Sequence, residues 1–91
     1  MTNDITGKVT EISEKEQITD RLEKQKIVLE VTERGSEKNY VNHYPVEFLN
    51  KNIGLLDGVS VGDEITLSVN VKGKKTASGK YFISIEAFRK K

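Results

Sequence analysis

The 91-residue sequence lacks cysteine and tryptophan and contains only one histidine and one proline. Without cysteine, neither a disulfide framework nor a thiolate metal site can form, and a lone histidine cannot complete a set of metal ligands. No apolar run approaches the roughly 20 residues of a membrane span, and the N-terminus lacks the basic and apolar regions of a signal peptide. We therefore expect a soluble, cytoplasmic protein with no metal and no cofactor.

Motifs that support catalysis are equally scarce. The sequence has no Gly-rich phosphate loop and no Gly-x-Ser-x-Gly elbow, and its carboxylates and hydroxyls have ordinary turn or strand explanations. We expect that the protein is not an enzyme. A chain of this length buries only about 60 to 65% of its unfolded surface, which is enough for one domain over residues 1–91 and too little for two cores.

Charge is segregated along the chain although the formal net charge is only +1. Residues 1–71 hold eight Lys/Arg and thirteen Asp/Glu, giving −5, whereas residues 72–91 hold seven Lys/Arg and one Glu, giving +6. This asymmetry indicates a local anion-binding surface on a weakly acidic body. The alternative is a solvated surface hairpin, since charge runs often serve only solubility.

Alternating apolar residues predict five strands. Ile65, Leu67, Val69 and Val71 alternate with polar residues, as a strand buried on one face requires. The same period places strands near residues 5–12, 24–33, 39–47, 63–72 and 80–89. The charged segment 14–22 has no clean strand period, so we interpret it as a connection, with a short helix as the alternative.

Local irregularities add detail to this pattern. Ile5, Gly7 and Val9 share a parity that Ile12 breaks, which predicts a bend near residues 10 and 11. Gly7 within a strand indicates a close approach or sharp coiling of a small barrel. Pro45 indicates an edge position or a strand end.

Segment 47–57 is the one helical candidate. Its apolar residues lie near a spacing of 3.6, and Asp57-Gly58 supplies a stop, which predicts a short helix between the third and fourth strands.

Parity also predicts which aromatic rings face inward. Tyr40, Tyr44 and Tyr81 fall on the buried parity, as do Ile83, Ile85 and Ala87 of the last strand. Phe82 and Phe88 fall on the opposite, outward parity.

Three strands in a meander, a helix and a closing hairpin are the parts of a five-stranded Greek-key barrel, the OB-fold. Closure would remove the exposed edges that five amphipathic strands otherwise leave. An SH3-like barrel is the main rival, and the helix between the third and fourth strands favours the OB-fold. The predicted class is all-β with one short helix.

An ordered set of short motifs supports this interpretation. The set comprises Ile5-Thr6-Gly7-Lys8-Val9, Lys24-Gln25-Lys26-Ile27-Val28-Leu29, Glu47-Phe48, Asn50-Lys51, Val61-Gly62-Asp63-Glu64-Ile65, Gly79-Lys80-Tyr81-Phe82 and Ala87-Phe88-Arg89. In this order the motifs resemble a family of short OB-fold proteins of anaerobic gut bacteria and their phages. Members are uncharacterised or described as single-stranded DNA-binding proteins, so the resemblance implies DNA binding and a part in replication or repair. Phe88 departs from the tryptophan frequent in such relatives, and basic residues 89–91 stand where longer bacterial single-strand binders carry an acidic, partner-recruiting tail.

The residue chemistry indicates the same function. Binding single strands without sequence preference needs a basic groove for phosphates and flat side chains on which bases stack. Phe82 and Phe88 supply outward rings, and lysines of the loop between the last two strands flank them. The candidate nucleic-acid-binding residues are Lys8, Lys24, Lys26, His43, Lys72, Lys74, Lys75, Lys80, Phe82, Phe88 and Arg89. The expected partner is single-stranded DNA, with RNA as an alternative ligand.

A protein-interaction or assembly module with no nucleic-acid role is the alternative function. In that case Phe82 and Phe88 pack in a subunit interface of a homo-oligomer or beneath a loop, and the lysines only solubilise the hairpin. One continuous groove holding both rings and the loop lysines would favour nucleic acid, whereas a flat apolar patch ringed by charge would favour protein.

Overall fold

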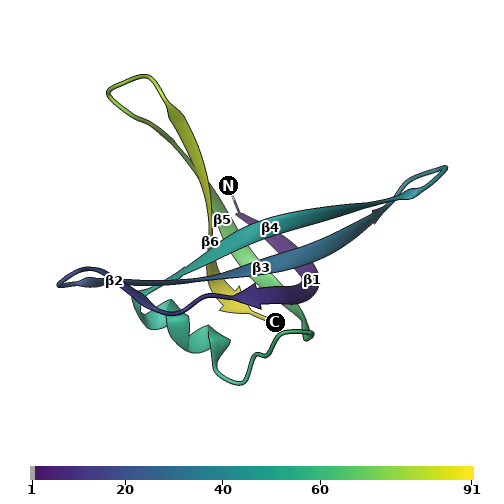
Figure 1. The fold of residues 1–91 in the computed structure, drawn as a ribbon, viewed down its shortest axis with the longest axis horizontal. Coiled ribbons are helices and arrows are strands. Elements are labelled where there is room, and N and C mark those ends of the chain that lie inside the picture. Colours follow the sequence, from purple (N-terminus) through teal and green to yellow (C-terminus); the bar gives the residue numbers. More distant parts are fainter. Residues whose placement is uncertain (1) are drawn as a thin grey trace.

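The computed structural model describes residues 2–91 and consists of one curved sheet with a single short helix (Figure 1). Its elements are β1 (Thr2–Ile12), β2 (Glu16–Thr19), β3 (Leu22–Arg34), β4 (Asn39–Leu49), the 3-10 helix η1 (Asn50–Leu56), β5 (Glu64–Lys75) and β6 (Tyr81–Lys90).

The sheet closes into a barrel. Its strand order is β1-β5-β6-β4-β3-β2, and an additional pairing of β1 with β3 joins the two sides. Neighbouring strands are antiparallel except β4 and β6, which meet through the parallel pair Glu47 and Glu86. A β1-β3-β4 meander followed by the β5-β6 hairpin is the OB-fold topology, and the predicted fold class is confirmed.

β1 serves both halves of the barrel, because it bends. Residues 2–8 pair with β5, residues 8–12 pair with β3, and the second register shifts between Val9 and Glu11. A Cβ on Gly7 would lie 2.8 Å from the backbone oxygen of Glu30 and 3.0 Å from Cγ2 of Val31. The predicted bend and the close approach at Gly7 are both confirmed.

The barrel interior is filled by alternate residues of the five long strands. The core comprises Val9, Ile27, Leu29, Val46, Phe48, Ile53, Leu56, Leu67, Val69 and Ala87. Ile53 and Leu56 come from η1 and are spaced by three residues, so in a helix with three residues per turn both point into the barrel. The predicted helix is confirmed in place, but it is a 3-10 helix and shorter than the 47–57 segment. Among residues 2–91, no helix is long and apolar enough to cross a membrane.

Segment 14–22 is not the simple connection that its composition predicted. β2 pairs with the start of β3, so the segment forms a short two-stranded arm. All four residues of β2 are exposed, so the strand has no buried face and its sequence shows no alternation of apolar and polar residues.

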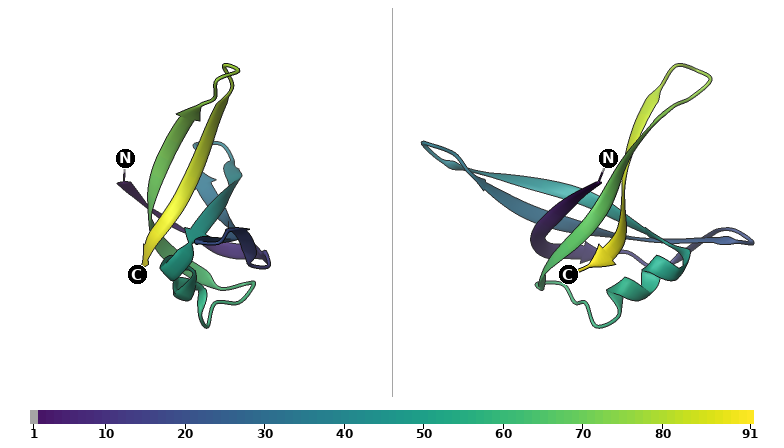
Figure 2. Two further views of the ribbon diagram at one scale, coloured as in Figure 1. Left: turned by 90° about the vertical axis from the view of Figure 1, so that its left-hand side faces the viewer. Right: turned by 180° about the vertical axis from the view of Figure 1, so that it is seen from behind.

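The β3–β4 and β5–β6 hairpins extend beyond the barrel as two further arms (Figures 1 and 2). The radius of gyration is 14.3 Å, against about 12 Å for a compact chain of this length. Tyr81 is 74% exposed, Ile83 76% and Tyr40 53%, so the prediction that they are buried is wrong. Their parity continues the core pattern into arms that have no opposite wall. Tyr44, nearer the barrel, packs against the core as expected.

β4 and β6 diverge beyond the pair Glu47 and Glu86 (Figure 1). Pro45 lies two residues past that pair, on the diverging part of β4. This position agrees with the expectation that Pro45 lies at an edge.

Candidate nucleic-acid interface

A groove crosses the outer face of β3 and β4 between the β2–β3 arm and the β5–β6 arm. One part, about 280 Å³, is lined by Ile18, Leu22, Lys24, Glu47, Leu49, Lys74, Phe82, Ser84 and Glu86. A second part, about 290 Å³, is lined by Lys26, Pro45, Glu47, Ile83, Ser84 and Ile85. Because the two parts share Glu47 and Ser84, we treat them as one groove.

Strand register explains why these side chains meet. Lys74 is the cross-strand partner of Phe82, and Lys72 is the partner of Ser84, so the basic residues of β5 and the aromatic ring of β6 share a face. On the opposite wall, Lys24 pairs with Leu49 and Lys26 with Glu47. The groove therefore combines cations, apolar surface and one aromatic ring.

Two lysines of the candidate set are already engaged in ion pairs. Nζ of Lys24 lies 3.4 Å from Oε1 of Glu47, and Nζ of Lys72 lies 3.0 Å from Oε1 of Glu86. Sequence reasoning missed both glutamates as groove residues. A signal existed for Glu86, the only acidic residue of the basic segment 72–91.

Other lysines have free ammonium groups. Within residues 2–91, the ammonium groups of Lys26, Lys74 and Lys80 have neither a hydrogen-bond nor an ion-pair partner. Lys26 and Lys74 line the groove, whereas Lys80 lies at the end of the β5–β6 arm. Lys75, on the same arm, lies over the ring of Tyr81 at 5.7 Å from its centroid. Free cations thus occur both in the groove and along the arm beside it.

The two outward phenylalanines lie in different places. Phe82 is 57% exposed and lines the groove, whereas Phe88 is 41% exposed and is not among the groove-lining residues. Phe88 lies where the β5–β6 register shifts, between the partners of Ser68 and Val69. The outward orientation predicted for both rings is confirmed, but they do not form one platform.

His43, Lys8 and Arg89 do not line the groove. His43 is exposed on the outer face of β4, with Nε2 3.7 Å from Oε2 of Glu30. Lys8 on β1 is the cross-strand partner of both Glu30 and Glu64. Arg89 pairs in register with Ser68 and acts electrostatically on Asp4. The structure thus brings together Lys24, Lys26, Lys74 and Phe82, with Lys72 at their edge.

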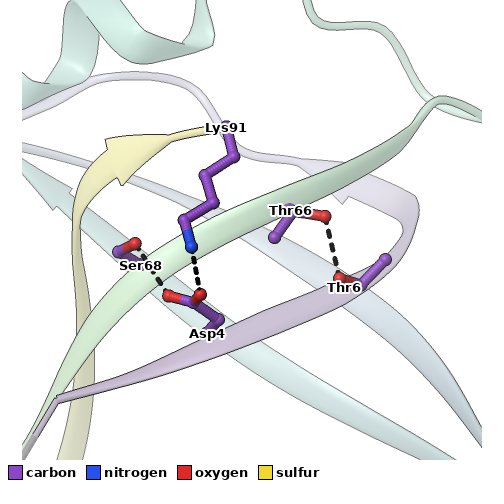
Figure 3. Close-up of polar contacts among 5 residues, drawn as sticks. All are labelled: Asp4, Thr6, Thr66, Ser68 and Lys91. Atoms are coloured by element: carbon purple, nitrogen blue, oxygen red, sulfur yellow. Dashed lines mark hydrogen bonds and ion pairs between the residues drawn. The ribbon is translucent and has the colours of Figure 1, made fainter.

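A separate polar cluster holds the chain end against β1 (Figure 3). Ser68 Oγ donates to Asp4 Oδ1 at 2.8 Å, and the Lys91 ammonium group bonds to Asp4 Oδ2. The hydrogen bond from Lys91 is the main cause that lowers the pKa of Asp4, and the bond from Ser68 adds to it. Beside this cluster, the hydroxyls of Thr6 and Thr66 are 2.8 Å apart. Lys91 is therefore engaged within the fold.

The mouth of the barrel, between the β3–β4 and β5–β6 arms, holds a separate hollow of about 390 Å³. Its walls are mainly apolar, with Ile5, Val31, Tyr44, Val71 and Ile85, and Asp4 is its charged residue. A phosphate chain needs cations. The groove, which has lysines in its walls, is therefore the better candidate for nucleic acid. Within residues 2–91, no three His, Asp or Glu side chains gather as a metal site would require.

The fold and the groove define an OB-fold protein with a mixed cationic and aromatic surface groove. Over residues 4–91 the sequence matches the family described as "Domain of unknown function (DUF3127)", and the chain belongs to that family. A search among curated proteins found no relative with significant sequence similarity.

Solved structures share this architecture at very low sequence identity. A small single-stranded DNA-binding protein from Mycoplasma pneumoniae aligns with a TM-score of 0.68 and 8% identity, covering 98% of this chain and 89% of that chain. Two structures of the protein PriB from Ralstonia solanacearum align with a TM-score of 0.74, at 8% and 7% identity, covering 99% of this chain and 94% of theirs. At such identities the likeness establishes the OB-fold alone.

Proposed function

We propose that this protein binds single-stranded DNA along the groove, without requiring a particular sequence, and that it is a binding protein and not an enzyme. The observation that carries the proposal is the meeting of an exposed ring, Phe82, with two free cations, Lys26 and Lys74, in one groove. The groove lies on the β3–β4 face and beside the β5–β6 loop, which OB-folds use for oligonucleotides.

Each part of the groove has a role in this proposal. Bases stack on Phe82, where each stack contributes roughly 1 to 3 kcal/mol, and Leu22 and Leu49 extend the apolar surface. Lys26 and Lys74 contact phosphates, and the lysines of the β5–β6 arm extend the cationic track. Lys24 and Lys72 contribute less, because glutamates already neutralise them.

The proposal also covers the cellular location of the protein and the process in which it acts. We place the protein in the cytoplasm of bacteria or phage-infected cells, in DNA replication or repair, with RNA as a second ligand class. The likeness to the Mycoplasma single-stranded DNA-binding protein supports DNA as the first ligand to test.

The direct test is fluorescence anisotropy with a labelled mixed-sequence strand of about 16 nucleotides, the upper end of the site size of one OB-fold. We expect binding that weakens as salt increases and that is several-fold weaker for the Phe82→Ala variant. Lys51→Ala is the matched control, because Lys51 is exposed on η1 and does not line the groove. A folded wild-type protein that does not bind the strand at low salt would refute the proposal.

A protein-interaction role is the second candidate, and the exposed arms favour it. Tyr81 and Ile83 are each about three-quarters exposed, and apolar exposure of this kind often marks protein contacts. If these arms join copies of the chain, sedimentation should show a concentration-dependent oligomer that Ile83→Ser dissociates. A monomer at all concentrations would remove self-association as the explanation.

A further inference from the structure

Two carboxylates lie in the floor of the groove where β4 meets β6. Glu47 and Glu86 form the parallel pair that joins these strands, and both line the groove. Their side chains are largely covered, at 21% and 19% exposure, so they form part of the floor. In each glutamate, Oε1 accepts a hydrogen bond from a lysine ammonium group, and Oε2 has no hydrogen-bond partner within residues 2–91.

These carboxylates restrict the path of a bound strand. A phosphate placed over Glu47 or Glu86 would gain no net attraction, because each carboxylate offsets the charge of its own lysine, whereas Lys26 and Lys74 offer free positive charge elsewhere along the groove. The sugar-phosphate chain therefore follows the lysines, and the bases turn toward the floor. Stacking on Phe82 at the groove wall is compatible with this orientation.

The free Oε2 atoms of Glu47 and Glu86 can only accept hydrogen bonds from a base that reaches the floor, because an ionised carboxylate cannot donate one. Cytosine, adenine and guanine each carry an exocyclic amino group that can donate to a free carboxylate oxygen. Thymine and uracil carry carbonyl oxygens on both sides of their one ring N–H. If the ring N–H donates to a carboxylate, a flanking carbonyl oxygen is brought close to the same negative group, so the contact is weaker than that of an amino group.

We propose that Glu47 and Glu86 make the groove select bases with an exocyclic amino group over thymine and uracil. This inference rests on the proposed function and adds to it a preference for base type, without a fixed sequence. It also predicts that oligothymidine is a poor ligand for this protein.

The test compares two strands of about 16 nucleotides, oligodeoxycytidine and oligodeoxyuridine, at the same salt and neutral pH. Both bases are pyrimidines without a methyl group, so stacking area and backbone charge are matched. A carboxylate contact to the cytosine amino group should make the cytidine strand bind about fivefold more tightly or better. Equal affinity, or tighter binding of the uridine strand, would overturn the inference while the proposed function stands.

Variants identify the groups responsible. Glu47→Gln and Glu86→Gln keep the size of the side chain but add an N–H donor, so the uridine strand should gain affinity. The ratio of the affinity for the cytidine strand to that for the uridine strand should therefore fall toward one. Glu30→Gln is the matched control, because Glu30 is also on the outer face of β3, next to His43, but does not line the groove. Its ratio should stay at the wild-type value.

The remaining outcomes are also decisive. A wild-type preference that persists in both glutamine variants would overturn the assignment to these carboxylates. If the mixed-sequence strand fails to bind, the proposed function fails, and the base preference fails with it. The wild-type comparison needs no variant, so it stays informative even if a substitution impairs folding.

Discussion

Salt dependence separates the two kinds of contact in the proposed groove. For a single strand, each phosphate contact contributes about −0.7 to the slope of log affinity against log salt. Lys26 and Lys74 are free in the groove, and Lys75 and Lys80 lie on the arm beside it. Three or four such contacts give a slope of roughly −2 to −3.

The perturbation is the double variant Lys26→Ala/Lys74→Ala. It should reduce the slope by about 1.4. Between 50 and 200 mM salt, the wild-type protein should lose roughly 15- to 60-fold in affinity and the double variant only about 2- to 10-fold. Phe82→Ala should instead cost roughly 1 to 3 kcal/mol at every salt concentration and leave the slope intact.

Anisotropy titrations of one labelled mixed-sequence strand at four or more salt concentrations would measure both effects. Lys51→Ala removes one charge outside the groove and should change neither the slope nor the intercept. If the folded double variant keeps the wild-type affinity and slope, the lysines are only a solvated surface. The interaction-module interpretation would then be the better one.

Three further predictions concern the ligand and the fold. In competition titrations, duplex of the same sequence should displace the single strand poorly, because paired bases hide the faces that stack on Phe82; equal competition would contradict this. In urea unfolding, Gly7→Ala should lower the free energy of unfolding by about 1 to 3 kcal/mol, since its Cβ would meet backbone at 2.8 Å. Gly54→Ala, where nothing lies within 4 Å of the added Cβ, should be neutral or stabilising by about 0.4 to 1 kcal/mol. An equal loss of stability in the Gly7→Ala and Gly54→Ala variants would refute the steric argument. Because the pKa of Asp4 is lowered from 3.8 in the fold, its stabilising contribution is present above that value and lost as pH falls through the lowered pKa. The stability gap between wild type and Asp4→Asn should therefore close in acid, and a gap that widens there would contradict the assignment.

The fold could be predicted because its determinants are local. Ile12 breaks the parity of Ile5, Gly7 and Val9, as a strand shared by two parts of a curved sheet must, and the register shift lies between Val9 and Glu11. Asp57-Gly58 ends the helical segment, with Gly58 at a φ of 78° that favours glycine. The 3-10 geometry was not predicted, because Ile53 and Leu56 satisfy both a 3.6 and a 3.0 period over so short a stretch.

The arms could not be predicted from the same signal. Alternation tells which residues share a face, but not whether another strand lies opposite that face. Ile85 and Ile83 have the same parity, and the first packs against the core while the second is 76% exposed. The difference depends on where the barrel wall ends, which is set by how far β5 and β6 extend past β1 and β4. That length is a property of the whole sheet.

The electrostatics of the groove depend on long-range register even more strongly. Counting charges identified segment 72–91 as basic, yet its cations differ in availability, because Lys72 is paired with Glu86 while Lys74 is free. Glu47 comes from a different part of the chain and lies beside Glu86 only through the single parallel pair between β4 and β6, one of the pairings that make up the barrel. A one-residue shift of that contact would turn one carboxylate to the barrel interior. Closure of the barrel therefore fixes the charge pattern of the groove floor, and with it the base preference proposed for this protein.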